Sequence, residues 1–163
     1  MKTLLAGARA LFAPLALLSL TLLAACRTVT PAELQDWGTR TYAGTTKPAA
    51  FKASMSAVRA LGYDIASTDA GTFQLRTAPK LVNVVASGSS YGAQAVDNSM
   101  AWDIDVSDSA AGVVVHATPR GYSGGQSIPA TKFSQSYAKK AFETLFGEIE
   151  HDMGVVPAAP AGR

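Results

Sequence analysis

The single cysteine of the chain, Cys26, stands at the end of an apolar run, and this feature constrains the sequence most. Lys2 and Arg9 make the start of the chain basic, and a largely apolar stretch then runs over residues 11–23. This stretch is shorter than the roughly 20 apolar residues of a transmembrane helix. Two alanines follow it, as at the cleavage site of a secretory signal. We therefore expect residues 1–25 to be a cleaved signal peptide.

The four residues Leu23, Ala24, Ala25 and Cys26 resemble the lipobox of bacterial lipoproteins. The resemblance implies cleavage before Cys26, a thioether-linked diacylglycerol on its sulfur and acylation of the new amino terminus. Several acyl chains anchor a protein stably, whereas one chain binds only marginally. The alternatives are an ordinary signal peptide with a chance cysteine, or an uncleaved membrane helix.

The residue after the cysteine is Arg27. In lipoproteins of the Gram-negative type, an Asp at this place tends to retain the protein at the inner membrane. Its absence implies an anchor in the outer membrane, with the domain at the periplasmic face. In a host that is not Gram-negative, the same anchor implies the cell membrane.

Composition limits what the mature chain can do. The precursor has 14 basic and 12 acidic residues, and removal of Lys2 and Arg9 with the signal balances the charges. We therefore expect no nucleic-acid partner, because such binding needs a basic surface. One cysteine also excludes an internal disulfide and a multi-cysteine metal site.

Three parts are expected after the signal: a lipidated N-terminus and tether over residues 26–38, a folded domain over 39–154 and a disordered tail over 155–163. Apolar residues at helical spacing predict helices over residues 48–61 and 134–152. A capping box at Thr30 and Glu33 predicts a short helix in the tether, which Gly38 would close. The predicted strands cover residues 40–43, 63–66, 72–78, 81–86, 100–107 and 113–118, and we expect flexible loops over 87–99 and 121–126.

This order predicts an α+β fold, a two-layer sandwich in which two helices cover one face of an antiparallel sheet of about five to six strands. Alternation places Gln74, Arg76, Asp103 and Asp105 on the other, wetter face. The stretch from Thr39 to about Lys80 resembles a segment of small proteobacterial lipoproteins of unknown function. The matching residues are Leu61-Gly62-Tyr63 and the turn at Asp69 and Gly71, and the layout is similar to helix-grip-like domains of envelope assembly lipoproteins.

Two motifs suggest chemistry but have a simpler explanation. Ser136 and Lys139 match the Ser-x-x-Lys pattern of penicillin-binding enzymes, but the two further motifs of that mechanism are missing. Asp103, Asp105 and Asp108 suggest a calcium loop, yet alternation places the first two on one strand face. We interpret the first motif as chance spacing on a helix and the second as a solvated strand.

Other candidate groups are the histidines and a glycine-rich segment. His116 should share the wet face with Asp103 and Asp105, and a His–Asp pair can act as base and orienter or as part of a metal site. His151 lies in a last helical turn, where a cation suits the helix dipole. The glycines at 121, 124 and 125 lack the spacing of a phosphate-binding loop.

We therefore expect no catalytic residues, no metal and no cofactor beyond the covalent lipid. The leading hypothesis is a non-catalytic envelope interaction or assembly module that binds an envelope protein, peptidoglycan or lipid. Its contact surfaces would be the wet face and the loop aromatics Tyr91 and Tyr122, with Trp37 as a further exposed aromatic. One alternative is a small hydrolase or metal-dependent enzyme that uses His116 with Asp103 or Asp105. Another is a structural lipoprotein with no specific ligand.

Overall fold

The computed structural model describes residues 28–89 and 92–155. The lipobox residues Leu23, Ala24, Ala25 and Cys26, the aromatic Tyr91 and residues 156–163 of the predicted tail lie outside the described residues. In chain order the elements are α2 (Pro31–Trp37), β1 (Thr39–Tyr42), α3 (Lys47–Ala60), β2 (Ile65–Asp69), β3 (Gln74–Thr77), β4 (Lys80–Ser89), β5 (Gly92–Ser109), β6 (Gly112–Ser123), β7 (Gln126–Ile128), the 3₁₀ turn η2 (Ala130–Lys132) and α4 (Gln135–Met153).

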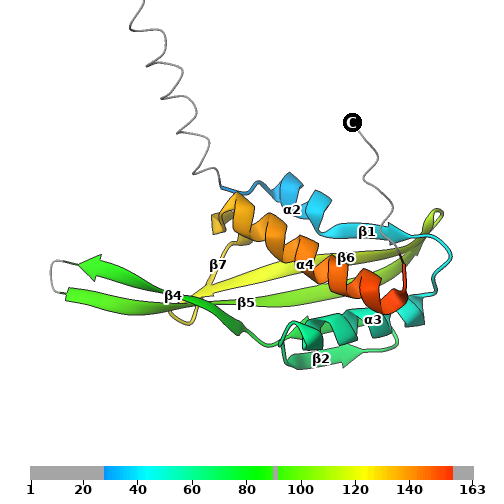
Figure 1. The fold of residues 1–163 in the computed structure, drawn as a ribbon, viewed down its shortest axis with the longest axis horizontal. Coiled ribbons are helices and arrows are strands. Elements are labelled where there is room, and N and C mark those ends of the chain that lie inside the picture. Colours follow the sequence, from blue (N-terminus) through cyan, green and yellow to red (C-terminus); the bar gives the residue numbers. More distant parts are fainter. Residues whose placement is uncertain (1–27, 90–91, 156–163) are drawn as a thin grey trace, which may run out of the picture.

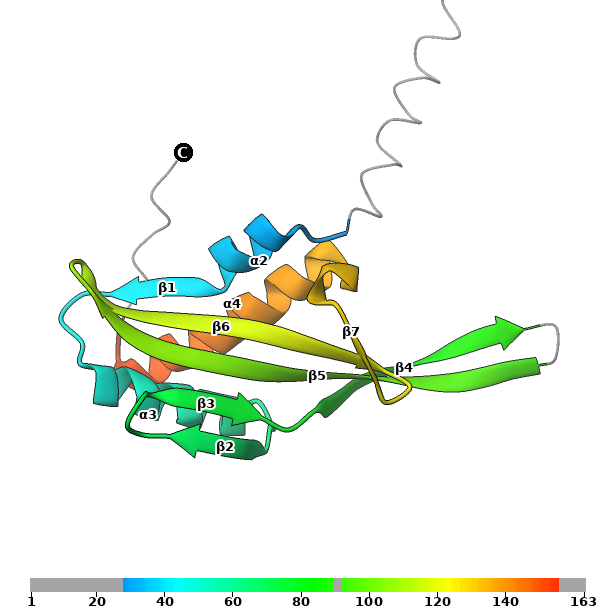
Figure 2. The same ribbon diagram turned by 180° about the vertical axis from the view of Figure 1, so that it is seen from behind.

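The strands form one antiparallel sheet with the order β1-β6-β5-β3-β2, in which β4 also pairs with β5 and β7 with β6. The helices α3 and α4 lie over one face, and the short α2 lies beside the N-terminal part of α4 (Figure 1). Seen from behind, the opposite face of β5 and β6 carries no helix of the described residues (Figure 2). The predicted α+β class is therefore confirmed, with seven strands rather than five or six.

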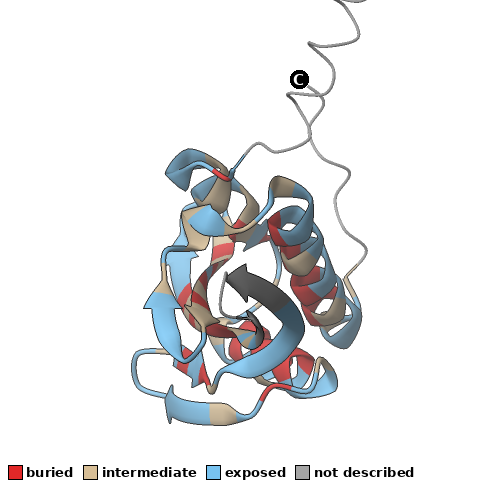
Figure 3. Ribbon diagram, turned by 90° about the vertical axis from the view of Figure 1, so that its left-hand side faces the viewer, coloured by how far each residue is buried: buried red, intermediate tan, exposed pale blue. Residues whose placement is uncertain are grey.

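The core lies between the sheet and the two long helices, where buried residues gather (Figure 3). Apolar stripes at helical spacing bury one side of α3 and of α4. At the centre, Trp102 of β5 meets Phe142 of α4 edge to face, with 5.3 Å between the ring centroids. The buried residues on the sheet side include Leu75, Trp102, Ile104, Val106, Val113, Val115 and Ala117.

The helix boundaries follow from their capping residues. Thr30 and Glu33 form the predicted capping box at the start of α2, and the backbone N–H of Gly38 closes that helix. Ser134 caps α4, which ends at Gly154 in the left-handed conformation with a φ of 65°. The two long helices lie within a residue or two of their predicted ranges.

From Thr28 onward, the segment predicted as a tether packs on the domain. Thr28 bridges to Ser134, and Val29 is only 3% exposed. Gln135 Nε2 donates a hydrogen bond to Glu33 Oε1 over 2.9 Å, which joins α4 to α2. The prediction of a connecting segment missed this docking, because one buried valine gives little signal in the sequence.

Two stretches predicted as loops are strands. Residues 87–89 and 92–99 belong to a long hairpin in which β4 pairs with β5 from Lys80↔Met100 to Ser89↔Gly92, and Figures 1 and 2 show it projecting beyond the helices. Residues 121–126 contain the end of β6, a turn at Gly124 and Gly125, and the start of β7. Both turn glycines have positive φ, the backbone that a tight hairpin requires. The loop predictions were wrong because Gly and Ser have low strand propensity, whereas ladder hydrogen bonds need only backbone groups.

Candidate functional site

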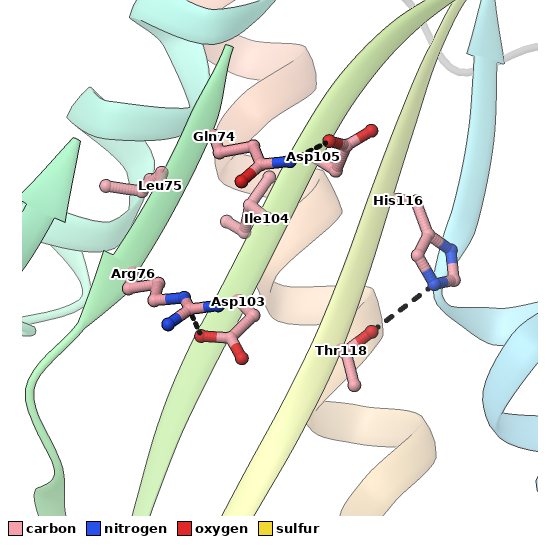
Figure 4. Close-up of a pocket in the computed structure, with 8 residues that line it drawn as sticks. All are labelled: Gln74, Leu75, Arg76, Asp103, Ile104, Asp105, His116 and Thr118. Carbon is pink, nitrogen blue, oxygen red and sulfur yellow. Dashed lines mark hydrogen bonds and ion pairs between the residues drawn. The ribbon is translucent and has the colours of Figure 1, made fainter. Parts of the chain in front are cut away.

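Polar side chains form two rows across the uncovered face of the sheet. The first row follows the register Gln74↔Asp105↔His116 and continues to Thr39 of β1. The second row follows the register Arg76↔Asp103↔Thr118. Figure 4 shows these side chains on β3, β5 and β6. The predicted placement of His116 on the same face as the two aspartates is confirmed. We call these two rows, together with Arg120 beside Asp103, the polar face.

In the first row, both nitrogens of the His116 ring have hydroxyl partners. Nδ1 lies 3.0 Å from Thr39 Oγ1, and Nε2 lies 3.3 Å from Thr118 Oγ1. Thr39 Oγ1 donates its own proton to the Gln35 carbonyl oxygen, so it accepts from the ring. This assigns the proton of the neutral imidazole to Nδ1 and leaves Nε2 to accept from Thr118.

Asp105 is engaged on the other side of the first row. Its Oδ2 accepts a hydrogen bond of 3.3 Å from Gln74 Nε2. Figure 4 shows the His116 ring directed toward Thr118, and its drawn hydrogen bond runs there rather than to Asp105. The cross-strand neighbours Asp105 and His116 therefore have separate partners.

The second row is centred on Asp103, whose Oδ1 lies 3.1 Å from Arg120 Nε and 3.7 Å from Arg76 Nε. Arg120 also donates to the Thr77 carbonyl oxygen over 3.1 Å and to the Tyr122 hydroxyl over 3.0 Å. These contacts fix the guanidinium between β5, β6 and the end of β3. The half-buried Tyr122 is thus a hydrogen-bond acceptor for Arg120 at the rim of the polar face, on strand β6 rather than in the predicted loop.

A shallow hollow of about 170 Å³ lies over the two rows. Its walls are Gln74, Leu75, Arg76, Asp103, Ile104, Asp105, His116 and Thr118. Among the described residues, no group of three His, Cys, Asp or Glu side chains is placed to hold a metal ion. Donors and acceptors of both charge signs line the hollow, so its chemistry suits recognition by hydrogen bonds and ion pairs.

The other sequence candidates do not converge on this hollow. Lys47 Nζ pairs with Asp108 Oδ2 at 2.9 Å, so the third carboxylate of the supposed calcium loop has its own partner. Lys139 pairs with Glu143 on the exposed side of α4, and His151 lies beside Asp152.

Trp37 is the last residue of α2 rather than part of a loop, and it is half-buried, with its ring 6.5 Å from that of Phe142. The prediction missed Thr39, Thr118 and Arg120 as members of the polar face. Extending the alternation beyond residue 118 would have found Arg120.

A scan against models of known protein families found no match. A search of curated proteins likewise found no match. Within the described part of the chain, no helix has both the length and the apolar character needed to cross a membrane.

Proposed function

We propose that this protein is a lipoprotein anchored through Cys26 at the periplasmic face of the outer membrane, and that its domain is a non-catalytic module that binds an envelope partner through the polar face. The observation that carries this proposal is the uncovered pair of polar rows on β3, β5 and β6. Helices cover the other sheet face, so the polar rows lie on the face of the sheet that a partner can reach.

The partners of the individual side chains favour binding over catalysis. A catalytic histidine of the triad type is oriented by a carboxylate. Here the ring nitrogens of His116 lie against Thr39 and Thr118, while Asp105 accepts from Gln74 and Asp103 pairs with Arg120. Side chains held in this way present a fixed pattern of donors and acceptors, as a recognition surface requires.

The lipobox ends two residues before Thr28, which bridges to the domain. Cys26 precedes Thr28 by two residues, which can span at most roughly 7 Å. A lipid on Cys26 would therefore hold the domain close to the membrane surface. This position suits a module that meets other membrane-associated components.

The mixture of charges favours a protein as the partner. Arg76 and Asp103 present both signs within one ion-pair distance, and Gln74 and Thr118 add neutral hydrogen-bonding groups. Protein surfaces offer matching groups of both signs. Peptidoglycan and lipid are the other outcomes that the experiment distinguishes.

Two measurements test the proposal. For the anchor, a labelled fatty acid should enter the wild-type protein and be absent from Cys26→Ala; equal labelling of both would refute the lipid site. For the surface, the lipidated protein should capture an envelope protein from detergent-solubilised membranes, and Arg76→Glu should abolish the capture. The control is Lys52→Glu, at an exposed position of α3, which should leave the capture unchanged. Equal capture by both variants would refute the polar face, and recovery of peptidoglycan or lipid alone would refute a protein partner.

A further inference from the structure

The outer edge of β4, in the hairpin arm that β4 forms with the first part of β5, is the longest unpaired strand edge of the described sheet. The strand β4 covers Lys80–Ser89 and pairs with β5 on one side only. The pairing of β5 with β6 ends at Asn98, and the Asp97 carbonyl oxygen still accepts from the Gly124 N–H. Beyond Asp97, the described residues of the two strands pair only with each other. A two-stranded hairpin is marginally stable by itself in water, so this arm would gain stability from a further strand.

The two ends of the strand path are protected against such association, and β4 is not. The end strand β1 has four residues and contains Arg40, and β2 has five and ends at Asp69. Short length and charge are the usual protection of sheet edges. The strand β4 has ten residues, roughly 33 Å, and its only charged residue is Lys80 at its start. Residues 81–96 contain no charged residue at all.

Exposed apolar side chains concentrate on this strand. Leu81 and Val84 are 53% and 54% exposed, and Val82 and Val85 are exposed as well. The register shift between Leu81 and Asn83 makes Val82 the extra residue of a bulge, which brings Leu81 and Val84 to the same face. On the other face, Val85 lies opposite Val96 of β5. The edge thus combines unpaired backbone groups with apolar side chains on both faces.

We propose that the β4 edge binds the β4 edge of a second copy of this chain, as an antiparallel pair about a twofold axis. About a twofold axis, residue i of one copy faces residue j of the other and j faces i, so the edge must be compatible with itself, and like charges along it would repel. The absence of charge from residues 81–96 removes that repulsion. Pairing of the two edges satisfies the free ladder groups and buries Leu81 and Val84 of both copies.

A lipid surface is a less suitable occupant of the arm. The exposed aliphatic residues lie in the first half of β4, next to the body of the domain, and the far half of the strand is Ala86-Ser87-Gly88-Ser89. An arm that enters a bilayer would carry its largest apolar groups at the far end. The pairing of two copies does not depend on the lipid anchor or on the polar face.

Cross-linking of the full-length chain in intact cells tests the pairing. Val84→Cys should give a dimer with a short bifunctional thiol reagent, at least tenfold more than Thr68→Cys on the exposed strand β2. Both variants are also made with Cys26→Ser. A cross-link that disappears with this change comes from a free Cys26 thiol, which would speak against the proposed anchor. Equal yields at positions 84 and 68, or an adduct of Val84→Cys with a different protein, would overturn the pairing.

A second measurement uses the purified full-length chain in a nonionic detergent. Sedimentation should give a dimer for the wild type and for Thr68→Lys, and at least tenfold weaker dimerisation for Val84→Lys. Val84 is more than half exposed, so lysine there should leave the fold intact, and circular dichroism checks this. A monomeric wild type would contradict the proposal. It would do so equally if the wild type, but not Val84→Lys, bound neutral phospholipid vesicles.

Discussion

Asp103 and Arg120 form an ion pair of 3.1 Å between neighbouring strands β5 and β6, on the diagonal two residues out of the cross-strand register. Arg120 also holds the Thr77 carbonyl oxygen and the Tyr122 hydroxyl, so a single guanidinium joins the polar face to the end of β3. The Arg120 side chain is therefore fixed by three different neighbours, and it holds Asp103 in place on the polar face.

Arg120→Ala should lower the free energy of unfolding by about 1–3 kcal/mol, because the Thr77 carbonyl loses its donor and Asp103 loses its ion-pair partner. Arg76→Ala is the matched control. The Arg76 side chain is 65% exposed, and loss of its pair should cost no more than about 0.5 kcal/mol. Urea unfolding of both variants gives the comparison. Equal losses would show that Arg120 is not the structural centre of the face.

Tyr42 donates a hydrogen bond of 3.3 Å to Glu150 Oε1, and Glu150 is only 8% exposed. Burial, and then the neighbouring carboxylate, raise the pKa of Tyr42 well above its ordinary value of 10.0. Burial also raises the pKa of Tyr137 to about 12. The folded chain therefore keeps these phenol protons at a pH where the unfolded chain has lost them. The contribution of these two phenols to the free energy of unfolding is therefore fully present below pH 10, and it is lost as the pH rises above that value.

Tyr42→Phe should cost about 1–3 kcal/mol at pH 8, because Glu150 loses its donor. It should also reduce the loss of stability above pH 10, because one titrating phenol is removed. Chemical unfolding at pH 8 and at pH 11 measures both effects. A variant with the same alkaline dependence as the wild type would contradict the role of Tyr42.

Gly38 permits a close approach between α2 and the sheet. A Cβ at Gly38 would lie 2.4 Å from the Ala117 carbonyl oxygen and 2.7 Å from that of Leu34. Gly38→Ala should therefore destabilise the domain by more than about 1 kcal/mol, since backbone atoms must move. Gly147, inside α4, has no neighbour within 4 Å of such a Cβ, and Gly147→Ala should stabilise by about 0.5–1 kcal/mol. Thermal unfolding of both variants should give shifts of opposite sign, and a common direction would refute this difference.

The long helices and the polar face could be predicted from local patterns. The apolar stripes at helical spacing and the caps at Thr30, Ser134 and Gly154 identify helices without tertiary information. Alternation along β5 and β6 placed Asp103, Asp105 and His116 on one face, because successive side chains in a strand alternate. The loop prediction over 87–99 failed because strand pairing is a tertiary property that small residues do not reveal.

Pro119 explains why the strand that carries Arg120 was predicted to end too early. Proline has no N–H and usually marks the end of a strand. Here the Trp102 N–H donates to Thr77 Oγ1, on the side of β5 away from β6. Trp102 and Pro119 are cross-strand partners, and since the Trp102 N–H points elsewhere, they form a pair without ladder hydrogen bonds. The missing N–H of Pro119 therefore costs no bond to β5, and the strand continues to Arg120 and Tyr122.

Photo-cross-linking in intact cells tests most directly whether the polar face binds an envelope partner. A photoreactive amino acid replaces Thr118, which is exposed on that face, and in a separate strain Lys52, which is exposed on α3. We expect a discrete protein adduct from position 118, its loss when Arg76→Glu is added, and no such adduct from position 52. The same adducts from both positions, or none from position 118 in a normally expressed protein, would contradict the account.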